Sequence, residues 1–220
     1  GAKLESPELL DGGTISLRAA RGFIELQQGS KLDVSGAIGD VIVPDASGTN
    51  FTTRKVATEG GKIRLVAPEN IRIDGDLNGR GWVNPKGSDV AGGSLEIALS
   101  RISSGFISDP NSLPSYPDVE RRILIAGDDV LPPAAAGTVV VADDLATAGG
   151  FSNLTLEADD RIEFAGNADL QVANRLELRT GNLSSADGQS VNVRANYVAL
   201  GPQSRLTPAP QTAEGGSASL

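Results

Sequence analysis

GGTISLRA at residues 12–19 and GGKIRLVA at residues 60–67 state the pattern that decides the fold: a glycine pair, then alternating apolar and polar residues ending in Ala. The same phrase recurs, with small changes, as GGSLEIAL from Gly92, GFSNLTLEA from Gly150, GQSVNVRA from Gly188 and GGSASL from Gly215. Further alternating runs follow the phrase. After Ile15 and Leu17, for example, the next run places Ile24 and Leu26 at equivalent positions. Alternation with period two indicates strands, and the glycines between the runs indicate turns.

The repetition predicts that these strands stack into coils. Residues 11–37 contain three alternating runs, with turns expected at residues 20–22 and 28–30, and residues 60–79 contain the next such set. Equivalent Ile, Leu and Val side chains would then lie above one another, with coils about 4.8 Å apart. We therefore expect an all-β chain, folded as a right-handed parallel β-helix (a solenoid) with protruding loops. Coils of about 20 to 25 residues would give about seven or eight of them.

A sandwich or barrel of antiparallel strands would show the same alternation. It would also need tight hairpin turns, for which Asn-Gly and Asp-Gly are the strongest signals. Asp11-Gly12, Asp74-Gly75, Asn78-Gly79 and Asp187-Gly188 occur, but none lies between two runs of equal length. The β-helix is the favoured fold.

Two stretches interrupt the repeat. Residues 37–59 are polar, contain Pro44, and are expected to form a loop that protrudes from one corner. Residues 103–136 form a Pro-rich insertion, with one strand of its own at residues 123–125, because proline cannot donate to a strand ladder. The whole chain, 1–220, is interpreted as a single β-helix segment cut from a larger protein, since it ends inside a copy of the phrase.

The composition of the chain argues against several classes of function. The net charge of −9 carries no basic stripe, so we expect no nucleic acid as a partner, and no apolar run is long enough for membrane insertion. The chain has no cysteine and no histidine, which removes thiolate metal sites and most acid–base chemistry, and no cofactor is expected. A cysteine-free chain also suits export through an outer-membrane pore.

The phrases GGTISLRA, QQGSKLDVSGA, GGKIRLVAPENIRIDGDLNGRG and GFSNLTLEADDRIEFAGNADLQVANRLELRT resemble the central repeats of filamentous-haemagglutinin-like exoproteins of bacterial two-partner secretion. The likeness covers most of residues 11–206. It implies a secreted, extracellular rod at the bacterial cell surface, used for adhesion, aggregation or biofilm, or as the stalk of a toxin-delivery exoprotein. It also implies an outer-membrane transporter during secretion and a host or bacterial cell-surface glycan or protein as partner.

Acidic residues raise two alternatives. The pairs Asp128-Asp129, Asp143-Asp144 and Asp159-Asp160, with Glu157 and Glu163 nearby, could serve a β-helical carbohydrate-active enzyme of the polysaccharide lyase or hydrolase type. Aspartates are common at turns, so we expect no catalytic residue and no enzyme.

The string IRIDGDLNGRG around Asp74, Asp76 and Asn78 loosely resembles a calcium loop but lacks its bidentate Glu, and no metal site is expected. An autotransporter passenger would give the same rod.

Recognition is expected on the loops, because binding residues concentrate on loops held by a rigid scaffold. Trp82, the only tryptophan, could stack on a sugar ring or pack at a coil corner. Tyr116, Arg121 and Arg122 make the Pro-rich insertion the most chemically varied stretch. We therefore predict Trp82, Tyr116, Arg121 and Arg122 as the ligand-binding contacts.

Overall fold

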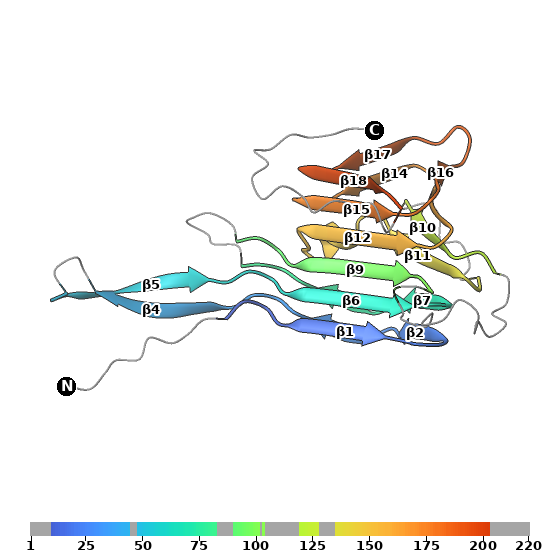
Figure 1. Ribbon diagram of the computed structural model, residues 1–220. Helices are drawn as coiled ribbons and strands as arrows, with labels where there is room; N and C mark the ends of the chain where they lie inside the picture. The colour runs from blue at the N-terminus through green and yellow to red at the C-terminus, as the bar shows by residue number, and fades with distance from the viewer. Residues whose placement is uncertain are drawn as a thin grey trace.

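The computed structural model describes residues 10–44, 48–82, 90–101, 103, 119–127 and 135–202. The chain is all-β, as predicted, and its longest sheet is a stack of six parallel strands in the order β1-β6-β9-β12-β15-β18 (Figure 1). The strands of this long sheet are β1 (Thr14–Arg18), β6 (Lys62–Ala67), β9 (Ser94–Leu99), β12 (Asn153–Ala158), β15 (Arg175–Arg179) and β18 (Tyr197–Gly201).

The remaining parallel strands form smaller sheets beside the long one. A four-stranded sheet has the order β11-β10-β13-β16, and the pairs β2-β7, β3-β8 and β14-β17 make three two-stranded sheets. Their bounds are β2 (Phe23–Leu26), β3 (Lys31–Asp33), β7 (Asn70–Ile73), β8 (Asp76–Asn78), β10 (Arg122–Ala126), β11 (Thr138–Ala142), β13 (Arg161–Ala165), β14 (Ala168–Gln171), β16 (Leu183–Ser185) and β17 (Val191–Arg194).

Four copies of the glycine-led phrase lie side by side in the long sheet. Ile15 pairs with Ile63, Ile63 with Leu95, and Leu95 with Leu154, so the first apolar residue of each copy occupies one column. Ile63, Leu95 and Leu154 are almost fully buried in the hydrophobic core. Because strand side chains alternate between faces, this register places the apolar set of every copy on the core side.

The copy that starts at Gly188 does not belong to this column. It forms β17, which pairs with β14 through Ala168 and Val191 in a different sheet. The strands that continue the long sheet there are β15 and β18, whose sequences RLELR and YVALG follow no glycine pair. Strands of every sheet alternate between apolar and polar residues. For this reason the sequence pattern grouped β17 with the strands of the long sheet, to which it does not belong. The copy at Gly215 lies outside the described residues.

The predicted strand sets at residues 11–37 and 60–79 are confirmed as β1-β2-β3 and β6-β7-β8. Gly22 and Gly29 have positive φ at the two predicted turns, a conformation that side-chain-bearing residues rarely adopt. Within the described residues the long sheet has six strands, whereas the expectation of seven or eight coils concerns the whole chain. The strands β12, β15 and β18 begin at 153, 175 and 197, as the expected coil length requires, but the earlier spacings are longer because other segments intervene.

The stretch 37–59, expected as a loop, is mostly a β-hairpin. The strands β4 (Ile38–Pro44) and β5 (Phe51–Ala57) pair antiparallel and extend away from the stacked sheets as an arm (Figure 1). At the base, the Ala37 N–H donates to Thr58 Oγ1 (2.8 Å) and the Thr58 N–H donates to the Ala37 carbonyl (2.9 Å). The polarity of the sequence correctly indicated exposure, but β-branched residues in both halves favour strands over an irregular loop.

The strand expected within the Pro-rich insertion belongs instead to the body of the fold. In β10, Ile123 and Ile125 are fully buried, and the strand pairs with β11 on one side and β13 on the other. The prolines around it hid its equivalence to the repeat strands. A single helical turn, α1 (Leu145–Ala148), also interrupts the stretch from residue 137 that the sequence pattern indicates as strands, and Ala146 of this turn is buried.

Candidate functional site

The four predicted ligand contacts fall in different surroundings. Trp82 is 40% exposed, and its carbonyl accepts a hydrogen bond from the Val90 N–H (3.3 Å). Tyr116 lies outside the described residues. Trp82 is therefore available to solvent, as a binding residue needs to be.

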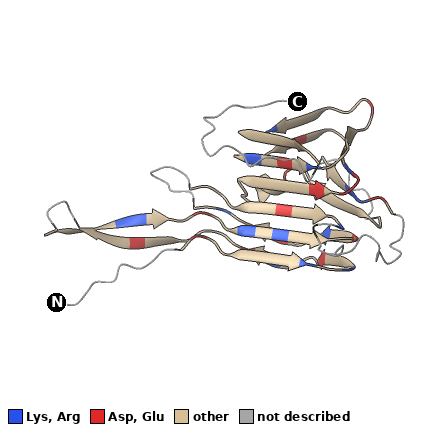
Figure 2. Cartoon of the chain, viewed as in Figure 1, with Lys and Arg blue, Asp and Glu red and all other residues tan. Residues whose placement is uncertain are grey.

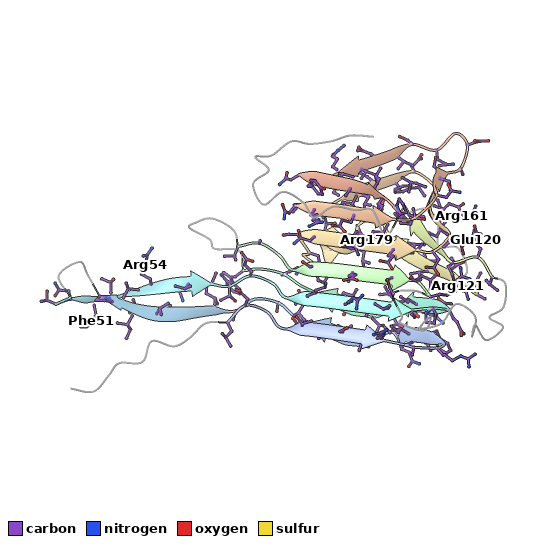
Figure 3. The ribbon with its side chains drawn as sticks, in the orientation of Figure 1. Phe51, Arg54, Glu120, Arg121, Arg161 and Arg179 are labelled. Atoms are coloured by element: carbon purple, nitrogen blue, oxygen red, sulfur yellow. The ribbon has the colours of Figure 1, made fainter. Side chains whose placement is uncertain are left out.

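Arg121 and Arg122 differ sharply although they are adjacent. Arg121 is 1% exposed, and its guanidinium donates to the carbonyls of Pro68 (2.5 Å) and Val119. Arg122 is half-buried and contacts Thr138 Oγ1 (3.0 Å) and Glu163 (3.4 Å). Figure 3 shows Arg121 close to Glu120 and Arg161, at the strand ends beside β10. Arg121 thus holds the backbone in place rather than facing a ligand, while Arg122 keeps one edge toward solvent.

Charged residues lie on several strands of the long sheet (Figure 2), and two clusters of ion pairs form on its outer face. Glu96 on β9 accepts from Lys62 Nζ (2.8 Å) and from Arg64 Nε (2.7 Å), both on β6. Burial raises the pKa of Glu96, but the hydrogen bonds from these two cations outweigh it and hold the pKa below the ordinary 4.5. The Glu96 carboxylate is therefore fully engaged by two cations, and these three side chains together carry one positive charge.

Replacing Glu96 by glutamine should remove a pH-dependent stabilisation of about 1 kcal/mol, a small value because both cations are partly exposed. A carboxyl whose pKa is lower in the folded state stabilises fully above the unfolded-state value of 4.5, and this contribution is lost as pH falls through the folded-state pKa. Urea unfolding of both chains at a series of pH values should show a difference that is constant near pH 7 and shrinks in acid. A difference that stays the same in acid would contradict this assignment.

A second buried charge cluster lies further along the same face. Arg179 on β15 contacts Glu177 (2.8 Å from Nε) and Glu157 on β12 (3.6 Å), and Arg175 also pairs with Glu177. Both carboxylates are almost fully buried. Ser103 also donates to Glu157, and Arg175 lies over the Tyr197 ring at 5.5 Å. This cluster ties β12, β15 and β18 together across three layers.

The acidic pairs considered for catalysis hold the backbone at the strand ends. Asp159 accepts from the Arg101 N–H and Nε (both 2.9 Å), and Asp160 accepts from the Arg121 N–H (2.5 Å). Asp143 accepts from the Asp169 N–H (2.8 Å). The pair Asp128-Asp129 lies outside the described ranges. These contacts are what turn aspartates are expected to make.

The loop considered for calcium is likewise bound to protein groups. Asp74 pairs with Arg72 Nε (2.6 Å), and Asn78 donates to Asp33 Oδ1 (3.1 Å). Hydrogen bonds from Lys31 and then Ser35 hold the pKa of Asp33 well below its usual range. Among the residues for which positions are described, no cluster of three His, Cys, Asp or Glu side chains could hold a metal ion.

An open groove lies on the outer face of β2 and β7. It has a volume of about 380 Å³ and is lined by Phe23, Ile24, Glu25, Glu69, Asn70, Arg72 and Ala136. Phe23 is 64% exposed, an unusual position for a large aromatic side chain. β11 lies next to β7, and the Gly137 N–H donates to the Glu69 carbonyl (3.1 Å). We call this site the Phe23 groove.

Sequence reasoning missed this groove because its residues come from strands that are distant in sequence and meet only by pairing. The pairing of β2 with β7 places Phe23 beside Asn70 and Glu25 beside Arg72. Within β2, Ile24 and Leu26 point into the core, so Phe23 and Glu25 must point outward. A signal was present: in an alternating strand whose core face is already filled by aliphatic residues, an aromatic residue on the other face is exposed.

Comparison of the chain with models of protein families, with curated proteins and with solved structures finds no match. Within the described part of the chain, no helix has the length and apolar character of a membrane span.

Proposed function

We propose that the chain is a segment of a right-handed parallel β-helix and serves as a structural rod and adhesive segment of a large secreted bacterial surface exoprotein. The observation that carries this proposal is the column in which Ile15, Ile63, Leu95 and Leu154 lie one above another in parallel strands. Strands that return in parallel to the same sheet are almost always connected with right-handed geometry, which supports the handedness.

The stack suits a rod because each layer depends mainly on its neighbours. Hydrogen bonds run from layer to layer, for example from the Lys62 N–H to the Gly13 carbonyl and from the Ser94 N–H to the Gly61 carbonyl (both 2.9 Å). Such a repeat extends by adding layers without changing the core. The absence of cysteine supports passage through an outer-membrane transporter, and the resemblance of the repeats supports a place at the bacterial surface.

One adhesive surface is the arm that leaves the stack. The arm of β4 and β5 exposes Ile42, Phe51 and Val56, which are 49%, 56% and 39% accessible. Figure 3 shows Phe51 and Arg54 on the arm, away from the sheets. A two-stranded ribbon also leaves two strand edges open, and open edges accept a further strand from a partner. A cell-surface protein or glycan is therefore the proposed partner.

Cell binding tests the adhesive part of the proposal. The fluorescently labelled chain should bind intact epithelial or bacterial cells, and a variant with residues 38–57 replaced by an Asn-Gly turn should bind less while keeping its circular dichroism spectrum. Ala37 and Thr58 are hydrogen-bonded to each other, so they can be joined by a short turn without opening the stack. A folded, β-rich chain that binds neither kind of cell would leave only the rod.

A further inference from the structure

We infer that the Phe23 groove binds a neutral sugar unit of a glycan chain. This inference deepens the proposed adhesive role and rests on it for its biological use. The groove volume of about 380 Å³ falls toward the lower end of the roughly 300–1,000 Å³ that is usual for ligand sites. It therefore suits a small ligand unit rather than a folded domain.

The groove combines one apolar surface with a row of polar groups. Phe23 presents its ring to solvent, and Asn70, its partner in the sheet register, stands next to it. The Oδ1 atom of Asn70 is buried, whereas the Glu25 and Arg72 side chains of the lining are 36% and 55% exposed. A pyranose ring has an apolar C–H face that stacks on an aromatic ring and hydroxyls at its rim, so it matches both features at once. A hydroxyl at the rim could donate to the exposed Glu25 carboxylate, a hydrogen bond to a charged group.

Charge selects a neutral sugar over an acidic one. The lining contains two carboxylates, Glu25 and Glu69, against one guanidinium, Arg72. Arg72 is already engaged by Asp74 (2.6 Å) and lies 3.8 Å from Glu25. The chain as a whole carries −9. A sialic acid, a uronic acid or a sulfated sugar would meet net repulsion in the groove.

The polar groups also argue against an apolar peptide as the occupant. A nonpolar side chain over Phe23 would cover Glu25 and Asn70 without giving them hydrogen bonds, and desolvated polar groups without partners are costly. A sugar satisfies these groups while covering the ring. The same set of residues therefore favours a ligand that is apolar on one face and hydroxylated at its edge.

An array of neutral and acidic oligosaccharides, followed by calorimetric titration of the strongest neutral binder, tests this inference. Phe23→Ala should weaken binding about tenfold, the factor that corresponds to about 1.4 kcal/mol, and Phe23→Trp should retain binding because the stacking surface remains. Leu200→Ala is the control, since Leu200 is 41% exposed but lies on β18, at the end of the long sheet opposite β1 and outside both the groove and the arm, and it should leave the affinity unchanged.

The inference is overturned if the folded chain binds no neutral oligosaccharide, if it binds only acidic ones, or if Leu200→Ala weakens binding as much as Phe23→Ala. Release of new reducing ends from an oligosaccharide would also overturn a binding role and favour the carbohydrate-active enzyme. Cell binding without neutral glycan binding contradicts this inference alone. Glycan binding without cell binding contradicts the adhesive proposal alone, so the two failures are distinguishable.

Discussion

Gly61→Ala and Gly93→Ala should each destabilise the chain by about 3 kcal/mol, at the upper end of the usual cost of overpacking. A methyl group on Gly61 would collide with the Gly13 carbonyl, and one on Gly93 would collide with the Gly61 carbonyl. These two carbonyl groups cannot easily move, because they accept hydrogen bonds from the backbone N–H groups of Lys62 and Ser94. If the two losses add, the double variant should lose about 6 kcal/mol, a large part of a typical domain's stability of about 5–15 kcal/mol.

Gly13→Ala is the matched control. Gly13 belongs to the same glycine pair pattern, yet a methyl group there would have no atom within 4 Å, and its φ is not positive. This variant should unfold at the same urea concentration as the parent chain, or slightly higher because alanine lowers the entropy of the unfolded chain. Equal losses at Gly13 and Gly61 would show that the glycines serve local flexibility and not the close approach of successive layers.

Arg179→Ala should cost about 2 to 3 kcal/mol of unfolding free energy, less than the loss of a fully buried pair because the arginine side chain is 31% exposed. Arg179 lies between Glu157 and Glu177, and the substitution leaves two buried carboxylates on neighbouring strands with one cation fewer, since Glu177 keeps Arg175. Urea unfolding at pH 7 measures the loss. Adding Glu157→Gln to Arg179→Ala should recover part of it, because one of the two like charges is then removed.

Lys55→Ala provides the comparison at the surface. Lys55 pairs with Asp40 at 3.1 Å on the arm, where both side chains are more than half exposed. Its removal should change the unfolding free energy by no more than about 0.5 kcal/mol, as is usual for exposed pairs. If Arg179→Ala were as mild as Lys55→Ala, the buried cluster would not join the layers. If Glu157→Gln brought no recovery, the loss would come from packing of the arginine stem and not from charge.

The core of the fold could be predicted from the sequence because its signal is local and repeated. Alternation in GGTISLRA and GGKIRLVA fixes which side chains face inward, and the shared spacing fixes their register. The same local signal could not separate β17 from the long sheet, since strands of every sheet alternate. It also missed the arm, where polarity was taken to mean a loop, and β10, where prolines broke the pattern.

The candidate site was harder to predict because it depends on contacts between layers. Arg121 and Arg122 look equivalent in sequence, but alternation buries Arg121 against Pro68 and turns Arg122 to the outer face. Phe23 and Asn70 are distant in sequence and meet only through the pairing of β2 with β7. The charge and composition of the chain could argue against some classes of ligand, such as nucleic acid. Only the pairing register of β2 with β7 shows that Phe23 and Asn70 lie side by side.

The most direct test of the stacked layers is the distance between spin labels at Thr14→Cys and Tyr197→Cys, which is practical because the chain has no cysteine of its own. These positions lie in one column, through Lys62, Ser94, Asn153 and Arg175, at the two ends of the long sheet. Five parallel spacings of about 4.8 Å place the two backbones about 24 Å apart. A narrow distribution near that distance is the predicted result. A broad distribution, or a mean distance far from it, would contradict the parallel stack on which the proposed rod depends.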